Sequence, residues 1–412
     1  MNEIYELELA FAESQLLDDD DLVNRGAYFA TVGGVPTNHF KLCAGEALHL
    51  PDGTARKRRH FFERNKFRTG YATHGLFPYR GKFHPQMVKG VLNAMGLRPG
   101  ELVLDPMMGS GTTLVEAVLM GIDAIGYDVS PFCHFMTAAK LGGFDVNLEP
   151  LESAVRNSET LFQFFTDVSK GNHRLAPVEQ MHRPVNDDLV NDEWLDPKVW
   201  GILLLAYLDS VGFAERSSRQ APNIQFHGIL ERYAAVTHKL QNRLTVLNLP
   251  VGRATAELGD ARALSIPNSS VDGILFSPPY SFAVDYVEND APHLRFLGTN
   301  LDELRKRMIG LRGRAMRQKF DFYLEDMRAV LAECARVLNH GRCCAIVIGT
   351  NTNQLGKLLG KAPAEVDGLD ALMIDLAENV GMHFERRFVR RIVGLANTMR
   401  DEDILLFRRQ QH

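Results

Sequence analysis

Four consecutive residues, Ser277, Pro278, Pro279 and Tyr280, offer the groups needed to hold an aromatic amine. The prolines have no N–H to donate, so they end the apolar run before them and hold a rigid turn with outward carbonyls. The Ser277 hydroxyl and the Pro278 carbonyl can accept the two hydrogens of an exocyclic amine, and the Tyr280 ring can stack on a planar base. Two acceptors favour a pyramidal nitrogen whose lone pair can attack an electrophilic methyl group. We predict a catalytic turn here, with a plain structural Pro-Pro turn as the alternative.

A second stretch, residues 102–113, has the pattern of a cofactor-binding loop. An apolar run ends at Asp105, and Gly109 and Gly111 follow just before a helix-period pattern begins. Glycines allow a sharp turn and put no Cβ between backbone and ligand, next to a helix N-terminus. A second apolar run ends at Asp128, nineteen positions after Gly109. An acid there is placed to accept hydrogen bonds from ribose hydroxyls. The combination predicts a nucleoside-cofactor site rather than a purely structural strand-loop-helix unit.

The elements that must position these residues alternate between strand and helix patterns. Such alternation predicts an α/β fold with a mostly parallel sheet covered by helices on both faces. The last two strands lie close in sequence, which predicts one antiparallel edge strand. The expected strands cover residues 102–104, 124–127, 254–257, 271–276, 343–348, 384–392 and 403–407, and the expected helices cover 87–95, 112–120, 323–338 and 369–379.

The chain divides into three regions by pattern. A catalytic core is expected over 71–144 and 251–412, interrupted by a mostly helical insertion over 145–250 that is a candidate for target recognition. Residues 1–70 are expected to form a small appended region. Its strand-like pieces cover 5–11, 27–32 and 47–50, and the acidic run 18–21 is interpreted as a solvated turn; the insertion's expected helices cover 151–168, 197–213 and 224–247.

Composition excludes several classes of protein. The 412 residues contain no run of apolar residues long enough to span a membrane, and the acidic N-terminus lacks the order of a signal peptide. Five cysteines without a C-x-x-C pair argue against a disulfide framework and against a thiolate zinc site. We therefore expect a reduced, cytoplasmic setting, no membrane association and no metal ion.

Two basic runs stand out on a chain whose net charge is −5. Residues 56–68 hold seven basic residues against one acid, and residues 305–319 hold seven basic residues and no acid. Such runs are typical of a surface that contacts phosphates, and a solvated helix or loop face is the alternative. The candidate nucleic-acid contacts are Arg56, Lys57, Arg58, Arg59, Arg305, Lys306, Arg307, Arg312, Arg314, Arg317 and Lys319.

Taken together, the catalytic turn and the glycine loop resemble those of the S-adenosylmethionine-dependent amino methyltransferases of DNA. That family combines a class I methyltransferase core, a Rossmann-like seven-stranded sheet, with an [Asp/Asn/Ser]-Pro-Pro-[Tyr/Phe] motif. Residues 78–85 are similar to the motif that precedes its glycine loop, although Arg80-Gly81 departs from the usual pair. The version of the motif that begins with Ser, as at Ser277, is associated mainly with methylation of cytosine N4, and the Asp version with adenine N6.

The resemblance implies a cofactor, a substrate and a set of site residues. S-adenosylmethionine would be the cofactor, with its methionine portion held by Asp105, Gly109 and Gly111, its ribose by Asp128 and its adenine amine by Asp260. Double-stranded DNA would be the substrate, its target base flipped out into the pocket. The complete cofactor set is Phe83, His84, Asp105, Pro106, Met107, Gly109, Ser110, Gly111, Thr112, Thr113, Asp128, Asp260 and Ala261.

Other functions compatible with the motifs stay open at this point. They are methylation of adenine N6 in DNA, methylation of a base amine in RNA, and nucleic-acid binding without turnover. The order of the motifs, cofactor loop before catalytic turn, excludes a permuted arrangement. A cognate restriction endonuclease or another defence component is a candidate partner.

Overall fold

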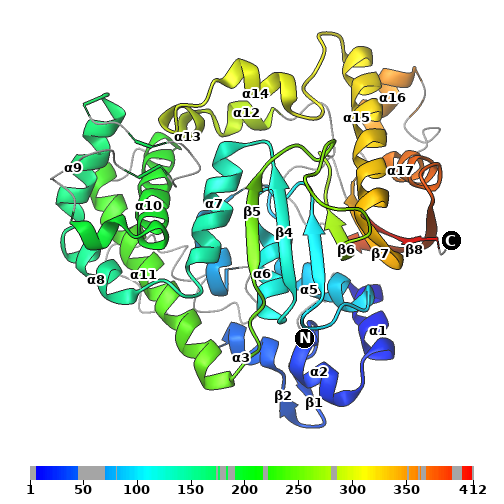
Figure 1. Cartoon of the computed structure of the whole chain (residues 1–412), viewed down its shortest axis with the longest axis horizontal. Helices are drawn as coiled ribbons and strands as arrows, with labels where there is room; N and C mark the ends of the chain where they lie inside the picture. The colour runs from blue at the N-terminus through cyan, green and yellow to red at the C-terminus, as the bar shows by residue number, and fades with distance from the viewer. Residues whose placement is uncertain are drawn as a thin grey trace.

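A single seven-stranded sheet with helices on both faces organises the computed structural model of the chain (Figure 1). The structure describes residues 6–44, 70–79, 81–172, 175–176, 182–183, 191–216, 221–279, 285–349, 352–360, 362, 368–391 and 401–410. The Arg56–Arg59 prediction, the strand expected at 47–50 and Tyr280 lie outside these residues.

The sheet confirms the predicted class I arrangement. Its strand order is β5-β4-β3-β6-β7-β9-β8, and every neighbouring pair from β5 to β7 is parallel. The strands are β3 (Leu102–Asp105), β4 (Asp123–Asp128), β5 (Ala254–Leu258), β6 (Val271–Phe276), β7 (Leu338–Ile348), β8 (Met382–Arg391) and β9 (Asp401–Arg409).

The position of the antiparallel strand differs from the prediction. The antiparallel strand is β9, and it lies between β7 and β8 rather than at the edge. Its run from Ile404 to Phe407 is buried throughout. Consecutive apolar residues point to both faces of the sheet, and both faces are covered by helices only where a strand lies inside the sheet. This run therefore favours an inner position for β9 and leaves β8 at the edge.

Each face of the sheet is covered by a different set of helices. Along β7, Cys343, Ala345 and Val347 pack with one cluster while Cys344, Ile346 and Ile348 pack with the other, as the strand period of two requires. The first face is covered by α1 (Leu7–Leu16), α5 (Pro85–Ala94) and α6 (Thr112–Leu119), and the second by α15 (Met316–Val337) and α17 (Leu369–Glu378).

The register of the parallel strands brings the predicted motifs to one edge. Asp105 at the end of β3 lies opposite Gly126 of β4, and Leu104 lies opposite Ile274 of β6. The carboxyl ends of these three strands therefore meet, and the loops that follow them face the same space. The glycine loop, Asp128 and Ser277 come from those loops or strand ends.

A helical block at the left of Figure 1 packs against α7 (Pro131–Gly142). Trp200 is fully buried in its core, and Trp194 is nearly so. The expected single helix over 151–168 is wrong, because Asn157 separates two helices. The block contains α8 (Leu148–Arg156), α9 (Ser158–Ser169), the short helix η3 (Asp192–Leu195), α10 (Pro197–Arg216) and α11 (Pro222–Leu247).

Shorter helices connect the core elements. The segment after the catalytic turn holds α12 (Tyr286–Asn289), α13 (Ala291–Phe296) and α14 (Leu301–Arg307). The helix α15 begins at Met316, earlier than expected, so the end of the second basic run is helical. A short helix η1 (Ala72–Gly75) precedes α5, and α16 (Thr352–Leu359) follows β7.

The N-terminal region is helical where strands were expected. Residues 5–11 were predicted as strand-like, but α1 covers Leu7–Leu16 and buries Leu9, Ala10 and Glu13 against α5. The alternation of this short run predicts a strand, but in the helix Leu7 and Phe11 are exposed while Leu9 and Ala10 pack on α5, so tertiary packing decides the structure against the pattern. The small sheet here pairs β1 (Thr31–Val32) with β2 (Val35–Pro36), and α3 covers Asn38–Ala44.

The acidic run at 18–21 begins a helix instead of forming a solvated turn. The Asp18 side chain accepts a hydrogen bond from the Asp21 amide at 2.8 Å and caps α2 (Asp19–Arg25). Three acids then occupy the first turn of α2. Negative charge is favourable at a helix N-terminus, which is the physical reason that this run is helical.

Candidate active site

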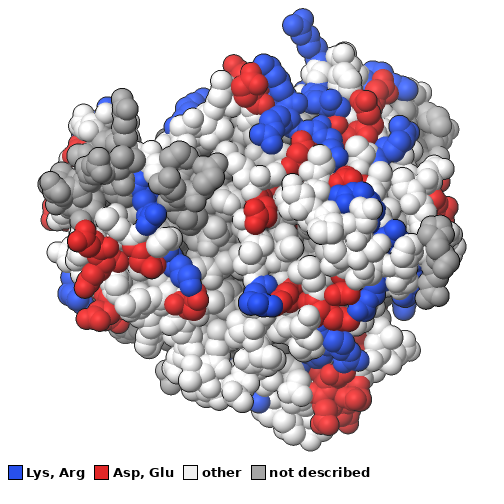
Figure 2. Space-filling model, in the orientation of Figure 1, with Lys and Arg blue, Asp and Glu red and all other residues white. Residues whose placement is uncertain are grey.

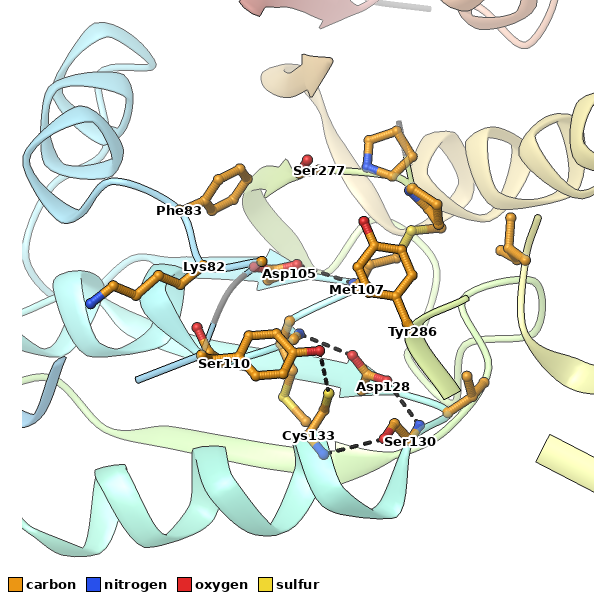
Figure 3. Close-up of a pocket in the computed structure, with 18 of the residues that line it drawn as sticks. Lys82, Phe83, Asp105, Met107, Ser110, Asp128, Ser130, Cys133, Ser277 and Tyr286 are labelled. Carbon is orange, nitrogen blue, oxygen red and sulfur yellow. Dashed lines mark hydrogen bonds between the residues drawn. The ribbon is translucent and has the colours of Figure 1, made fainter. Parts of the chain in front are cut away.

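The glycine loop and the catalytic turn face one pocket of about 520 Å³ at the carboxyl edge of the sheet. In the view of Figure 3, Ser277 lies above Asp128, with Phe83 to the left of Ser277 and Tyr286 to its right. A pocket of this volume, lined mostly by apolar groups with a few convergent polar ones, suits a small organic ligand.

The glycine loop is held by the carboxylate of Asp128. The Gly109 amide donates to Asp128 Oδ2 at 2.9 Å, and the Ser130 amide donates to Oδ1 at 2.8 Å (Figure 3). Gly109 and Gly111 have φ angles of 49° and 73°, which side chains other than glycine rarely adopt. Each carboxylate oxygen keeps a second lone pair, so Asp128 can hold the loop and still accept from a ligand hydroxyl.

Burial raises the pKa values of the two acids at the strand ends. The pKa of Asp105 rises to about 7 and that of Asp128 to about 6, since each carboxylate loses water. Asp105 is 1% exposed, and its Oδ1 accepts from the Met107 amide at 3.1 Å. A ligand that brings positive charge or hydroxyl donors would stabilise the ionised forms of both acids.

Asp260, the predicted partner of an adenine amine, is already paired with Arg262. Nε of Arg262 donates to Asp260 Oδ1 at 2.9 Å, and Nη2 donates to Oδ2 at 2.7 Å. Arg262 also bonds Asp326 at 2.7 Å, which fixes the guanidinium. The pair keeps the pKa of Asp260 below its usual value although partial burial opposes this. Asp260 therefore lines the pocket as an ionised acceptor whose orientation is set by Arg262.

The other wall is formed by Ser277, Pro278 and Pro279. Ser277 is half-buried, and no side chain or backbone group of the described residues hydrogen-bonds its hydroxyl. The Tyr286 ring reaches the pocket from α12 and is also half-buried (Figure 3). Tyr280 lies outside the described residues, so its predicted stacking role stays a prediction.

Several pocket residues have no counterpart among the predicted ones. Tyr79 and Asp290 line the pocket and bond each other at 3.1 Å through the Tyr79 hydroxyl. Arg390 of β8 donates to Glu402 of β9 at 2.7 Å and to Glu6 at 2.5 Å. The acid shortly after the catalytic turn could have suggested Asp290. No nearby sequence pattern could have indicated Arg390. One of its partners, Glu402, is brought to it by strand register, and the other, Glu6, lies near the N-terminus.

All the predicted cofactor residues except Gly111 and Thr113 line the pocket. His84 does so with a pKa lowered to about 4, mainly by burial, so its imidazole is neutral at pH 7. That these residues hold a cofactor stays a prediction. The pocket is suited to a nucleoside cofactor with an amino-acid tail. The buried carboxylate of Asp128 could accept from ribose hydroxyls, and the glycines with positive φ let such a ligand approach the backbone.

Most of the second basic run is paired with acids. Arg305 bonds Glu288 at 2.7 Å, Lys306 bonds Glu303 at 2.6 Å, and Arg317 bonds Asp321 at 3.2 Å. Arg312 bonds the buried Asp326 at 2.7 Å. Figure 2 shows acidic side chains between the basic ones at the top of the view, over α14 and the start of α15.

Three members of the run differ from the others. Arg307, Arg314 and Lys319 form no salt bridge within the part of the chain that the structure describes. Arg307 and Arg314 are exposed and Lys319 is half-buried. We call these three residues the free basic set. They are the three cations of the run without a carboxylate at salt-bridge distance in the described residues, and the charge of Arg307 also acts on Asp260.

Neither a metal cluster nor a membrane span is found in the residues that the structure describes. They include no group of three or more His, Cys, Asp or Glu side chains placed to hold a metal ion. They also include no helix that is long and apolar enough to cross a membrane.

The sheet order and the pocket at the carboxyl edge define a class I methyltransferase fold. A family profile described as DNA methylase matches residues 56–138, which include the glycine loop and Asp128. Over this stretch the chain is similar to the DNA amino methyltransferases. S-adenosylmethionine is the cofactor that this similarity implies.

Relatives match over different parts of the chain. A type II methyltransferase, M.MjaII of Methanocaldococcus jannaschii, is 47% identical over 73 residues, which are 18% of this chain and 14% of that protein. M.BsoBI of Geobacillus stearothermophilus is 22% identical over 277 residues, 57% of this chain and 54% of that protein. A tRNA (guanine(10)-N2)-dimethyltransferase of Methanothermobacter thermautotrophicus is 38% identical over 53 residues, 13% of this chain and 16% of that protein. The chain thus spans about half the length of M.BsoBI and much less of the others.

Proposed function

We propose that this protein transfers a methyl group from S-adenosylmethionine to the N4 amine of a cytosine in DNA. The observation that carries the proposal is that Ser277 and Pro278 face the same pocket as the glycine loop and Asp128. The two halves of a methyl-transfer reaction, a donor site and an amine site, are thereby opposed. Ser rather than Asp at the first position of the motif favours cytosine.

The residues of the pocket would act by orientation. The cofactor supplies the electrophilic methyl group. The Ser277 hydroxyl and the Pro278 carbonyl accept the two amine hydrogens, which localises the nitrogen lone pair and points it across the pocket. As the C–N bond formed, the bond between the methyl carbon and the sulfonium sulfur would break with its electron pair on sulfur, so that neutral S-adenosylhomocysteine would leave. The nitrogen would then return to neutrality by releasing one proton to water. No covalent intermediate with the protein is needed.

A base inside a duplex cannot present its amine to this pocket, so the target must be flipped out of the helix. The half-buried ring of Tyr286 offers a flat surface beside the catalytic turn. The free basic set lies on the segment that follows the turn, and Met308 and Ile309 of the same segment line the pocket. We infer that this segment contacts the phosphates next to the flipped base.

Incubation with labelled S-adenosylmethionine and either genomic DNA or total RNA tests the substrate. Nucleoside analysis should find N4-methylcytosine from the DNA. N6-methyladenine would move the assignment to the adenine reaction, and N2-methylguanine from RNA would favour the function named for the tRNA-modifying relative. The Ser277→Ala variant is the matched control, and label in its nucleosides at the rate of the parent protein would contradict the role of Ser277.

The relatives named type II methyltransferases suggest a partner. We propose that an endonuclease with the same recognition sequence accompanies this protein. DNA methylated to completion should resist such an endonuclease, whereas DNA incubated with Ser277→Ala should be cut. Cutting of fully methylated DNA by every candidate would contradict the partnership.

A further inference from the structure

Two buried side chains of α7 hold the back of the glycine loop. The Thr137 hydroxyl donates to the carbonyl oxygen of Gly109 at 3.1 Å, and Lys140 Nζ donates to the carbonyl oxygen of Ser110 at 3.0 Å. Thr137 is 0% exposed and Lys140 is 1% exposed. The two residues are three positions apart, so they lie on the same side of the helix. They do not line the pocket.

The hydrogen bond from Thr137 fixes the direction of an amide. In a trans peptide unit the C=O and the following N–H point in opposite directions. Because the Gly109 carbonyl points at α7, the Ser110 N–H points away from α7, and Ser110 lines the pocket. No acceptor among the described residues takes this N–H. The loop therefore presents an unused donor on its pocket side.

The glycine at position 111 allows this contact. A Cβ built on Gly111 would lie 2.5 Å from Cγ2 and 2.7 Å from Oγ1 of Thr137. Any side chain at 111 would push the loop away from α7. Gly111 is thus needed for close packing on Thr137, which explains why this predicted site residue does not itself line the pocket.

Lys140 places a buried amino group behind the loop, and this group is partly protonated at neutral pH. No carboxylate of the described residues forms a salt bridge with its ammonium, and burial together with the nearby Lys82 lowers the pKa of Lys140 to about 7. An unpaired buried cation is costly unless something compensates for it. An anionic group bound on the other side of a thin glycine loop would do so, and the Ser110 N–H would donate to the same group.

We propose that Thr137 and Lys140 are positioning residues that aim the glycine loop at the carboxylate of the cofactor's amino-acid end. The inference rests on the proposed function, since it takes S-adenosylmethionine as the ligand. It assigns the carboxylate to the Ser110 amide and gives α7 a part in cofactor recognition that the loop sequence does not show.

Binding of two ligands can distinguish a role of Thr137 and Lys140 in cofactor recognition from a role in loop stability alone. S-adenosylhomocysteine carries the amino-acid end and 5′-methylthioadenosine lacks it, while both carry the same nucleoside. Calorimetry should find that Thr137→Val, which replaces the hydroxyl with a methyl group of similar size, weakens S-adenosylhomocysteine binding about three- to tenfold. Methylthioadenosine binding should change less than about twofold, and Thr137→Ser, which keeps the donor, should bind both ligands as the parent protein does.

Lys140→Met gives an independent second measurement, and it should show the same selective loss. Unchanged binding of S-adenosylhomocysteine by Thr137→Val and Lys140→Met would overturn the inference. Equal losses for both ligands would also overturn it, because they would mean that the loop had collapsed as a whole. A parent protein that binds neither ligand would contradict the proposed function instead, so the two failures are distinguishable.

Discussion

The two walls of the pocket are built in different ways. On the cofactor side, Asp128 is engaged by backbone amides of Gly109 and Ser130, and the carbonyls behind the loop are engaged by α7. On the target side, the Ser277 hydroxyl has no hydrogen-bond partner among the described residues. Apart from the unused Ser110 N–H, the polar groups named on the cofactor side hold one another, whereas on the target side the Ser277 hydroxyl that would meet the amine is unused.

This difference indicates how the two substrates are handled. A wall whose polar groups already hydrogen-bond one another is preorganised, so its geometry is the same before and after the ligand binds. A wall with an unused hydroxyl becomes satisfied only when a donor arrives. We therefore expect the cofactor to bind without nucleic acid, and we expect the target amine to supply the missing partner of Ser277.

The largest expected effect comes from removing that hydroxyl. Ser277→Ala should lower the turnover number by at least about 100-fold, because the amine loses one of the two acceptors that localise its lone pair. The affinity for S-adenosylhomocysteine should stay within about twofold, since the cofactor wall does not depend on Ser277. Single-turnover kinetics and calorimetry measure the two quantities separately.

If Ser277→Ala lost cofactor affinity and turnover together, the two walls would not act independently, contrary to the comparison above. A Ser277→Thr variant serves as the control, because it keeps a hydroxyl on the same turn. It should retain more turnover than Ser277→Ala. Equal activities for the two variants would mean that the hydroxyl is not the acceptor.

The cofactor wall could be predicted from the sequence because it is local. The apolar run, Gly109, Gly111 and Asp128 follow one another within a single strand-loop-helix-strand unit, so pattern and spacing identify them. The seven-stranded sheet was predictable for the same reason. The inner place of β9 was not, since it depends on how two late strands compete for the edge of β7.

Residues that act through distant contacts could not be predicted in this way. Arg390 is bonded to Glu6, which is 384 positions away in the sequence, and to Glu402 through strand register. Lys140 follows an ordinary helical pattern, and only the packing of α7 shows that it touches the loop. Residues 7–11 alternate as a strand would, with Leu7 and Phe11 exposed, and only the packing of Leu9 and Ala10 on α5 accompanies their helical form.

The second prediction concerns the internal bonds of the cofactor wall. Asp128→Asn leaves one oxygen for two backbone donors and places an NH₂ beside the other, so the loop loses a hydrogen bond. We expect S-adenosylhomocysteine to bind about 10- to 100-fold more weakly, at a stability cost of about 1–3 kcal/mol. Isothermal calorimetry and thermal unfolding measure the two effects.

Asp123→Asn is the matched control on the same strand. Asp123 pairs with Arg253 at the opposite end of β4, away from the pocket, so its neutralisation removes the same charge. Its effect on cofactor affinity should be less than about twofold. If the two variants bound the cofactor equally well, Asp128 would not be the residue that organises this wall.

The third prediction concerns the rim of the target wall. Neutralising the free basic set in the triple variant R307Q/R314Q/K319Q should weaken DNA binding about tenfold at moderate salt. It should also reduce the slope of log affinity against log salt by about one for each phosphate that the variant no longer neutralises. Fluorescence anisotropy at several salt concentrations gives both quantities.

The matched control removes three cations that already have acidic partners. R305Q/K306Q/R317Q changes the net charge by the same amount, but its cations are paired with Glu288, Glu303 and Asp321. It should change the salt slope less. Identical slopes for the two triple variants would show that net charge alone matters, and that the free basic set makes no phosphate contact.

The smallest effect is a pH dependence of cofactor binding that belongs to Asp128. Burial raises the pKa of Asp128 from 3.8 to about 6 in the folded protein. Protonation therefore favours the folded state, and this contribution to stability is lost as the pH rises from about 4 to about 6. We expect cofactor binding to have the opposite sign, because the ribose hydroxyls proposed to contact Asp128 would donate to the ionised carboxylate.

Through Asp128 alone, the affinity for S-adenosylhomocysteine should fall about fourfold between pH 8 and pH 5.5. Calorimetry across this range measures the fall. Asp128→Asn should remove this part of the pH dependence and leave the parts due to Asp105 and Lys140, whose pKa values are each about 7. An unchanged pH profile in Asp128→Asn would assign the ribose contact to another group and would remove Asp128 from the ligand side of the preorganised wall.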